Sequence, residues 1–410
     1  MLYPKKESKI QFEKFEEKDY LPIRHDGFST LAIHVGQEPE QVHGSVNVPI
    51  HLSSTYAQKD IAQPYTEHEY TRCSNPTRSA LEKCIAAIEY GKYCITFASG
   101  CGATSTIVHT LKTGDHMIVC DDVYGGTQRY LRLFSQNKYG IDVEFIDMTN
   151  IENLTKAIKE TTKMVWIETP TNPTMKLIDI DEAVKATKKI NQKIKVVVDN
   201  TFATPYLQSP LLLGADIAYN SCSKYIGGHS DLIAGAIVYN DAEFHKEVYM
   251  AAKSLGANPS PFDCYLMLRG LKTLEERVIK STSNGFHLAH FMEKHPAIES
   301  ISYPGLKNFQ FHEVAKKQMR GFGAMITFRI KGGKEQASKF LKASHIFTLA
   351  ESLGGVESLG QVPAFMTHAS VPVETRNKLG ITDNLIRLSV GLESIEDIIE
   401  DVQNALKVSQ

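Results

Sequence analysis

The chain has 410 residues, 42% of them apolar and 22% charged, which is ordinary for a globular protein of two or three domains. Lys and Arg together number 45 and Asp and Glu 47, so the net charge is −2. This balance excludes a general nucleic-acid binder or a polybasic membrane-surface protein. The longest uncharged stretch, Tyr93 to Leu111, is rich in Ser and Thr, which excludes a membrane-spanning helix there.

The first twenty residues are half charged and lack an apolar segment, which excludes a signal peptide and predicts a solvated arm. The seven cysteines are odd in number and no two are spaced CxxC, so we expect neither a disulfide framework nor a cysteine-type zinc site. The histidines show no metal-binding spacing, so no metal is expected. A reducing compartment follows, and we expect a cytoplasmic protein.

From about residue 92 to 240, short apolar runs alternate with helical patterns. The runs predict seven strands, over 93–98, 116–122, 143–148, 164–169, 195–200, 215–221 and 232–239. Helices are predicted between them, for example from Asn150, a residue suited to an N-cap, to Lys159, and from Asp181 to Ile190. Strands rich in Val and Ile that alternate with helices predict a mostly parallel sheet covered by helices.

The last third of the chain changes character. The absence of proline from Phe262 to His295 predicts helix over this stretch. Apolar runs over 324–330 and 385–391 predict further strands, and helices are predicted over 334–344 and 395–407. This mixed pattern predicts a smaller α+β domain.

Ligands of an open parallel sheet bind beyond the carboxyl ends of its strands, so the residues that follow each strand are informative. The first predicted strand is followed by Ser99-Gly100-Cys101-Gly102, which opens a helix. Two glycines at a helix start can present backbone N–H groups to a phosphate. An ordinary tight turn explains them equally well, and a dinucleotide fingerprint is disfavoured because Ser105 stands where it requires glycine.

Two other strand ends carry ionisable residues. Asp199 directly follows an apolar run, where an acid is costly to bury unless it meets a cation. Lys224 lies in Ser221-Cys222-Ser223-Lys224, where it is either a solvated side chain or a Schiff-base lysine beside phosphate-binding hydroxyls. Together with the glycine turn, these residues are the parts that a pyridoxal-phosphate enzyme needs.

Longer motifs strengthen this interpretation. They include YTRCSNPTR (70–78), FASGCGAT (97–104), DDVYGGT (121–127), WIETPTNPT (166–174), VVVDNT (196–201), SCSKYIGGHSD (221–231) and IRLSVGLE (386–393). With them, the chain from about Gly27 onward resembles the Cys/Met-metabolism family of pyridoxal-phosphate enzymes. The resemblance implies an α/β protein of the aspartate-aminotransferase type (fold type I), with a large seven-stranded sheet domain and a smaller C-terminal α+β domain.

The resemblance also implies a domain layout and an assembly. Residues 1–75 are expected to form an arm that reaches a neighbouring subunit, residues 76–270 the cofactor domain and residues 271–410 the C-terminal domain. The expected assembly is a homotetramer made of two catalytic dimers. We expect a small-molecule amino-acid substrate, and neither a nucleic-acid nor a membrane partner.

The resemblance assigns cofactor roles to matching positions. Lys224 is expected to form a Schiff base with pyridoxal 5′-phosphate and to carry protons to and from substrate carbons. Asp199 is expected to pair with the pyridine nitrogen, and Tyr124 to stack on the ring and act as a base. The remaining implied ligands are those of the phosphate, namely Gly100, Cys101, Ser221 and Ser223, with Tyr70 and Arg72 contributed by a neighbouring subunit.

Substrate roles are implied in the same way. Arg387 is expected to bind the α-carboxylate as a two-pronged donor, assisted by Asn172. The other implied pocket residues are Glu351, Ser352, Thr367 and Arg129. Thr201 is expected to pack near Asp199. Cys222 is expected to face away from the two serines, and Trp166 to lie in the core.

Members of the family catalyse β- and γ-elimination and γ-replacement. Gly126 stands where methionine-cleaving members carry Cys, and Glu351 could bind the second ammonium group of cystathionine. We therefore expect α,γ-elimination of L-cystathionine to L-cysteine, 2-oxobutanoate and ammonia, a step of transsulfuration and cysteine biosynthesis, with hydrogen sulfide release as a side activity. The alternatives are γ-replacement on an activated homoserine and a catalytically silent oligomer, which the presence of Lys224, Asp199, Tyr124 and Arg387 disfavours.

Overall fold

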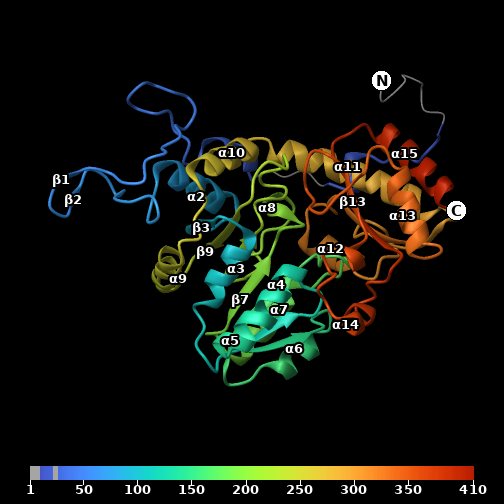
Figure 1. Cartoon of the computed structure of the whole chain (residues 1–410), viewed down its shortest axis with the longest axis horizontal. Coiled ribbons are helices and arrows are strands. Elements are labelled where there is room, and N and C mark those ends of the chain that lie inside the picture. The colour runs from blue at the N-terminus through green and yellow to red at the C-terminus, as the bar shows by residue number, and fades with distance from the viewer. Residues whose placement is uncertain (1–9, 22–25) are drawn as a thin grey trace. The chain divides into compact units, whose positions relative to one another are not determined.

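The computed structural model describes residues 10–21 and 26–410 and divides the chain into two compact units (Figure 1). The larger unit comprises the described residues of 24–172 together with 176–275. The smaller unit comprises the described residues of 1–23 together with 173–175 and 276–410. The arm that we expect over residues 1–75 stays a prediction.

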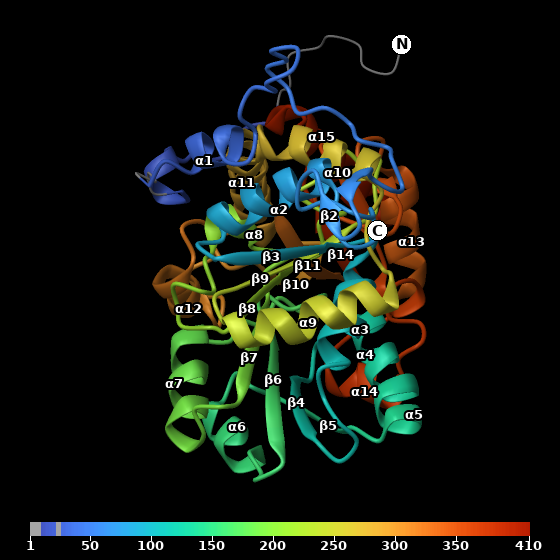
Figure 2. The same cartoon turned by 90° about the vertical axis from the view of Figure 1, so that its left-hand side faces the viewer.

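The larger unit is built on a seven-stranded sheet of order β3-β9-β8-β7-β6-β4-β5, which Figure 2 lets the reader follow. Strands β8, β7, β6, β4 and β5 are parallel neighbours, whereas β9 pairs antiparallel with both β3 and β8. The prediction of seven strands in a mostly parallel sheet is confirmed. Their bounds are β3 (Tyr93–Phe97), β4 (His116–Cys120), β5 (Asp142–Ile146), β6 (Thr162–Glu168), β7 (Lys195–Asp199), β8 (Ile217–Asn220) and β9 (Gly235–Tyr239).

Helices cover this sheet, so most residues of its strands are buried. Every residue of β4, β8 and β9 is buried, and Trp166 on β6 lies fully in the core, as expected. Asn150 caps the helix that follows β5, as predicted, because its side chain accepts the amide of Glu152. The helices are α1 (Phe28–His34), α2 (Pro76–Ile88), α3 (Gly100–Val108), α4 (Gly125–Tyr130), the π-helical η2 (Leu131–Gln136), α5 (Asn137–Tyr139), α6 (Ile151–Ala157), α7 (Ile180–Ile190), α8 (Thr204–Leu207), α9 (Ala242–Leu255) and α10 (Pro261–Leu271).

A two-stranded ribbon precedes these elements in the larger unit. Its strands are β1 (Gln58–Asp60) and β2 (Gln63–Pro64), and they pair antiparallel with each other. Figure 1 shows the ribbon lying away from the sheet of its own unit. Several apolar side chains of the ribbon and of the segment that precedes it in the chain are exposed, among them Val42 (80%), Val46 (81%) and Ile61 (92%).

The smaller unit contains a five-stranded sheet of order β10-β11-β14-β13-β12. Its strands are β10 (Ile298–Ser302), β11 (Met325–Ile330), β12 (Thr348–Leu349), β13 (Leu359–Gln361) and β14 (Leu385–Ser389). Its helices are η1 (Glu17–Asp19), α11 (Leu274–Glu293, whose first two residues belong to the larger unit), α12 (His312–Gln318), α13 (Lys334–Ala343), η3 (Pro363–Phe365), α14 (Val373–Lys378) and α15 (Ile395–Ser409). The predicted smaller α+β domain is confirmed, although only β11 and β14 of its strands were predicted.

The helix predicted over 262–295 is confirmed for most of its length, but the chain forms two helices there, α10 and α11, with a break at Lys272 and Thr273. The Thr273 amide bonds to the Gly270 carbonyl at 3.2 Å, which tightens the last turn of α10. Gly270 lies so close to the neighbouring backbone that an added Cβ would meet the Gly227 carbonyl oxygen at 2.5 Å. The lack of a Cβ at Gly270 therefore lets α10 pack closely against the Gly227 backbone.

The predicted solvated arm over residues 1–20 is also wrong where the structure describes it, and residues 1–9 lie outside the described part. Phe15 packs edge-on against Phe286 with ring centroids 5.0 Å apart, and its amide donates to His287 Nε2 at 3.0 Å. Tyr20 and Leu21 are buried. The aromatic side chains among the charges of this segment anchor it to α11, within the smaller unit.

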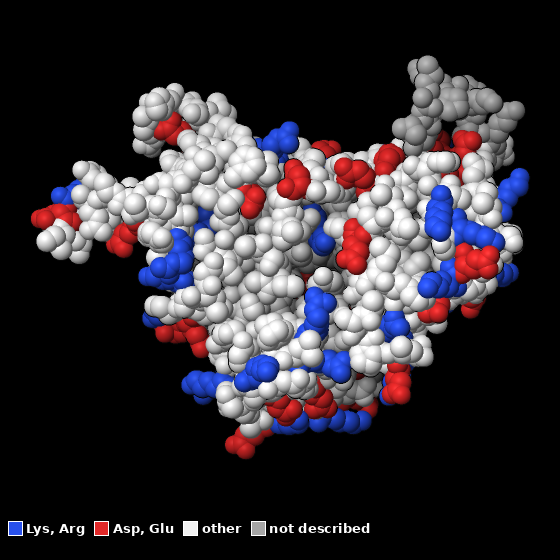
Figure 3. All heavy atoms as spheres, viewed as in Figure 1, with Lys and Arg blue, Asp and Glu red and all other residues white. Residues whose placement is uncertain are grey.

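Charges of both signs are interspersed on the face of the molecule drawn in Figure 3, without a broad region of positive charge. No helix in the described residues is both long and apolar enough to cross a membrane. No group of three or more potential metal ligands is found among the described residues.

Candidate active site

The amino end of α3 presents two backbone donors. Ser99 caps the helix by accepting the Gly102 amide at 3.0 Å. The amides of Gly100 and Cys101, which no helical carbonyl can reach, donate to no acceptor among the described residues. A Cβ at Gly100 would lie 2.6 Å from Tyr219 Oη and 3.3 Å from Ser221 Oγ, so only glycine brings this helix end so close to Ser221. The arrangement suits a phosphate.

Thr201 joins the end of β7 to the end of β8. Its amide donates to Asp199 Oδ1 at 3.0 Å, and its hydroxyl accepts the Ser221 amide at 2.9 Å. The predicted pyridine-nitrogen partner and a predicted phosphate ligand are thus fixed by one threonine, which the sequence analysis expected near Asp199.

Asp199 is a buried carboxylate, 6% exposed, with no Lys or Arg within ion-pair distance among the described residues. Burial raises the pKa of Asp199 to about 6, although the two hydrogen bonds from Thr201 act in the opposite direction. A buried acid of this kind is stabilised when a cation is placed against it. A protonated pyridine nitrogen would be such a cation.

Sequence reasoning missed Glu168, which lies opposite Asp199 in the pairing of β6 with β7. Its carboxylate accepts the Tyr124 amide at 2.8 Å and the Asn172 amide at 2.9 Å. Burial, reinforced by the charge of Asp199, raises the pKa of Glu168 well above its usual range. The signal was available, because Glu168 ends an apolar strand in the same way as Asp199 does.

Glu168 thereby brings together two predicted site residues, Tyr124 at the start of α4 and Asn172 in the loop after β6. The Tyr124 ring is 39% exposed and lies over Gly126, where any Cβ would collide with it. Arg129, one turn farther along α4, is exposed. No hydrogen bond or ion pair of Arg129 is found among the described residues, so its role stays a prediction.

The lysine loop is a tight turn after β8. The Lys224 amide donates to the Ser221 carbonyl at 3.2 Å, and the Lys224 carbonyl accepts the Gly228 amide at 2.7 Å. The Ser223 hydroxyl exchanges hydrogen bonds with the backbone of Ala234, at 2.9 and 3.2 Å. Between the two serines, Cys222 is fully buried and its thiol contacts the Asn220 carbonyl, whereas Ser221 and Ser223 are half-buried.

Tyr70 and Arg72 lie close together on the segment that follows the β1–β2 ribbon. The Arg72 guanidinium lies over the Tyr70 ring, 5.5 Å from its centroid, and Arg72 Nη1 donates to the Lys253 carbonyl at 3.0 Å. Tyr70 is 45% exposed. These contacts leave both side chains near the surface of their own unit.

The remaining predicted substrate residues belong to the smaller unit. Arg387 on β14 is 2% exposed, and its Nη2 donates to the Ser352 carbonyl at 2.6 Å. With its amide oxygen turned toward the guanidinium, Gln361 accepts Arg387 Nη1 at 3.2 Å and the Thr367 hydroxyl at 3.0 Å. Ser352 has a φ of +86°, an uncommon value for a residue with a side chain, and it follows the exposed Glu351.

The residues of the larger unit fit pyridoxal phosphate. The Gly100 and Cys101 amides offer two donors for the phosphate, and the buried Asp199 carboxylate suits a positively charged ring nitrogen. Lys224 lies in the turn that begins with Ser221, directly after β8. The negative phosphate and the positive ring nitrogen of the cofactor would thus each meet a group of complementary charge in the larger unit.

Comparison with known proteins agrees with this chemistry. The sequence model of the family described as "Cys/Met metabolism PLP-dependent enzyme" matches residues 29–407. The cystathionine gamma-lyase of Macaca fascicularis is 51% identical over 401 residues, which cover 96% of this chain and 98% of that protein. The cystathionine gamma-lyase of Dictyostelium discoideum is 48% identical, with 92% and 97% covered.

Solved structures with similar folds bear different names. The crystal structure of metB from Corynebacterium glutamicum has a TM-score of 0.90 and 44% identity, covering 96% of this chain and 99% of that one. A cystathionine gamma synthase from Xanthomonas oryzae pv. oryzae, in complex with aminoacrylate and cysteine, has a TM-score of 0.90 and 38% identity, with 93% and 98% covered.

Proposed function

Because this chain belongs to the Cys/Met metabolism family of pyridoxal-phosphate-dependent enzymes, we propose that it is a carbon–sulfur lyase acting on L-cystathionine. The proposed reaction is α,γ-elimination, in which L-cystathionine and water yield L-cysteine, 2-oxobutanoate and ammonia. Relatives named cystathionine gamma-lyase, about half identical over nearly the whole chain, support this reaction. Release of hydrogen sulfide from cysteine is the proposed side activity.

Pyridoxal phosphate, when bound, supplies an electron sink for the negative charge that develops at the substrate Cα. We propose that Lys224 Nζ would take the proton from Cα, give it up again and, once deprotonated, take a proton from Cβ, which would let the bond at Cγ break. Asp199 would keep the cofactor ring nitrogen protonated. Tyr124 accepts a proton from the substrate amino group, and Glu168 keeps the Tyr124 backbone in place through its hydrogen bond.

The observation that carries the choice of substrate is the contact between Arg387 and Ser352. A buried guanidinium suits the α-carboxylate that all amino-acid substrates share. The same guanidinium binds the carbonyl next to Glu351, so the loop that carries an exposed acid is tied to the carboxylate-binding residue. We propose that Glu351 receives the second ammonium group of cystathionine, which simpler substrates lack.

The test is product identification with the purified holoenzyme. Incubation with L-cystathionine alone should yield 2-oxobutanoate and cysteine at equal initial rates, before cysteine itself is consumed. Incubation with an O-acylated homoserine plus cysteine tests γ-replacement, the alternative that the similarity to a cystathionine gamma synthase keeps open. Formation of cystathionine in the second reaction, without breakdown of cystathionine in the first, would refute the lyase assignment.

We also propose a cytoplasmic homotetramer of two catalytic dimers. Exposed apolar side chains around the β1–β2 ribbon suit burial against a second copy of the chain, as does the exposed Tyr70. All seven cysteines are free, and five of them are buried, which suits a reducing compartment. Sedimentation velocity of the holoenzyme tests the assembly directly.

A further inference from the structure

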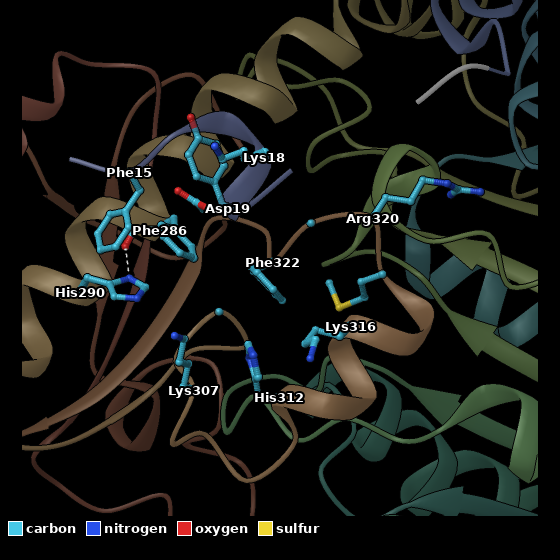
Figure 4. A pocket seen from close by; sticks show the side chains of 14 residues that line it. Phe15, Lys18, Asp19, Phe286, His290, Lys307, His312, Lys316, Arg320 and Phe322 are labelled. Atoms are coloured by element: carbon cyan, nitrogen blue, oxygen red, sulfur yellow. Dashed lines mark hydrogen bonds between the residues drawn. The ribbon is translucent and has the colours of Figure 1, made fainter. Parts of the chain in front are cut away.

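A cavity of about 550 Å³ lies entirely among residues of the smaller unit, whereas the cofactor residues belong to the larger unit. Its walls come from the N-terminal segment, α11, α12 and the loops on either side of α12. Figure 4 shows the side chains that line it. Nothing in the proposed reaction uses this cavity, which is in the size range of small-molecule sites.

One wall of the cavity is a continuous series of aromatic rings. Phe15 packs against His290 with centroids 4.5 Å apart, and His290 packs against Phe286 at 4.2 Å. Phe286 is nearly parallel to Phe322 at 6.1 Å, and Phe322 stacks with His312 at 5.5 Å. Each histidine ring is held by a hydrogen bond to a backbone carbonyl. His290 Nδ1 lies 2.9 Å from the Phe286 carbonyl oxygen, and His312 Nδ1 lies 2.8 Å from the Pro304 carbonyl oxygen.

The lining also carries an excess of positive charge. The cationic side chains are Lys18, Lys307, Lys316 and Arg320, and the one acid in the lining is Asp19. Lys18 pairs with Glu16, outside the lining, at 2.6 Å. No carboxylate among the described residues lies within ion-pair distance of the exposed Lys307. Lys316 contacts Glu313 at 3.0 Å, but an exposed pair of this kind contributes little stability and can exchange for a better anion. Figure 4 shows Lys307, His312 and Lys316 on the same side of the cavity.

From this combination we propose that the cavity binds a heteroaromatic ring that bears phosphate groups, the chemistry of a nucleotide. The aromatic wall offers a surface for stacking, which every heteroaromatic base can use. Lysine ammonium groups are mobile point charges that suit phosphate oxygens. A purely apolar ligand would leave the cations unused, and an inorganic phosphate would leave the aromatic wall unused.

The test uses the holoenzyme, so that the cofactor residues are occupied, and three probes measured by isothermal titration calorimetry. ATP carries both the ring and the charge, adenosine carries the ring alone, and tripolyphosphate carries the charge alone. ATP should bind at one site per chain and at least about tenfold more tightly than either partial probe. Absence of saturable ATP binding, or equal affinity for tripolyphosphate, would overturn the proposal.

Two variants separate the contributions. Phe322→Leu should weaken ATP binding by about tenfold and leave tripolyphosphate binding unchanged, because only stacking is lost. Lys316→Ala should weaken binding of both by about three- to tenfold. The matched control is Lys246→Ala, since Lys246 in the larger unit makes the same kind of exposed pair, with Glu243 at 2.8 Å.

Circular dichroism and thermal melting identify a variant that has lost its fold. If Phe322→Leu has lost its fold, Phe322→Tyr replaces it. Phe322→Tyr keeps a ring for stacking and should retain ATP binding. If Lys246→Ala weakens ATP binding as much as Lys316→Ala does, the binding is a general charge effect and the proposal is wrong. Wild-type affinity in both Phe322→Leu and Lys316→Ala would also refute it, because ATP would then bind elsewhere.

Discussion

Glu168 and Asp199 lie opposite each other at the carboxyl ends of the adjacent parallel strands β6 and β7. Both carboxyl groups are buried, and burial raises the pKa of each. Glu168 is held by two backbone amides, from Tyr124 and Asn172, whereas the hydrogen bonds of the Asp199 carboxylate within the described part of the chain come from Thr201. Of the two acids, Asp199 therefore has more to gain from a cation brought by the cofactor.

The first prediction follows from the raised pKa of Asp199. With a pKa of about 6 in the folded protein without cofactor, against an ordinary value of 3.8, Asp199 binds its proton more tightly when folded. The free energy of unfolding of the apoprotein should thus fall as the pH rises through this window, by up to about 3 kcal/mol. Asp199→Asn should raise the melting temperature of the apoprotein at pH 7.5, and the gain should vanish near pH 4.

Two comparisons make this prediction specific. Asp231→Asn, which alters an exposed carboxylate of the same unit, should give no such pH-dependent gain. In the holoenzyme the ring nitrogen should compensate the Asp199 charge, so Asp199→Asn should no longer stabilise and should lose most turnover. If the difference in melting temperature between Asp199→Asn and the wild type is the same with and without cofactor and at both pH values, the assigned pairing of Asp199 with the ring nitrogen is wrong.

The second prediction concerns the covalent bond to the cofactor. The holoenzyme should absorb near the border of the visible and ultraviolet, and borohydride should bleach this absorbance by reducing the Schiff base. Peptide mapping after reduction should place the cofactor on Lys224. Lys253, a lysine of the same unit whose carbonyl contacts Arg72, serves as the internal control, and a label there or on any other lysine would refute the assignment.

The larger sheet could be predicted because burial on both faces selects apolar residues at consecutive positions. Val196, Val197 and Val198 on β7 are fully buried, and such a run is visible in the sequence. Strands β12 and β13 have two and three residues, too few for any periodicity, and were missed. The break between α10 and α11 at Lys272 and Thr273 has no proline to mark it in the sequence.

The candidate site was predictable where a residue ends a strand in a distinctive motif, as for Asp199 and Lys224. The partnership of Glu168 with Tyr124 was not, because it joins residues 44 positions apart whose proximity depends on the strand order. The anchoring of Phe15 on Phe286 was also missed, because these residues are far apart in the chain. In addition, the charges around Phe15 resemble those of a solvated segment.

The third prediction tests sites shared between subunits. Tyr70 and Arg72 lie near the surface of their own unit, beside a ribbon with exposed apolar side chains. If Arg72 contributes to the phosphate site of a neighbour, Arg72→Ala and Lys224→Ala chains should both be inactive alone. Equal mixing should restore about one quarter of wild-type activity, because half of the dimers are hybrid and each carries one intact site.

Subunit exchange must be demonstrated in that experiment, for instance by mass spectrometry of differently tagged chains. A mixture of Lys224→Ala with Lys224→Arg chains is the matched control, since no hybrid of these two can contain an intact site. Exchange without recovery of activity would show that Arg72 acts within its own chain.

The last prediction concerns Glu351 and substrate choice. Its carboxylate is proposed to meet the second ammonium group of cystathionine, and Arg387 ties its loop through the Ser352 carbonyl at 2.6 Å. Loss of one charge-assisted contact should lower kcat/KM for cystathionine by roughly ten- to hundredfold. Cysteine and homocysteine lack that group, so Glu351→Ala should leave their kcat/KM nearly unchanged.

Two further variants separate this role from general effects on the loop. Arg387→Ala should impair every substrate, because all of them share the α-carboxylate. Glu374→Ala, which removes another exposed acid of the same unit, should change none of them. If Glu351→Ala lowers kcat/KM equally for cystathionine, cysteine and homocysteine, then Glu351 maintains the loop and does not select the substrate. The preference for cystathionine would then have to arise from residues that contact its carbon chain.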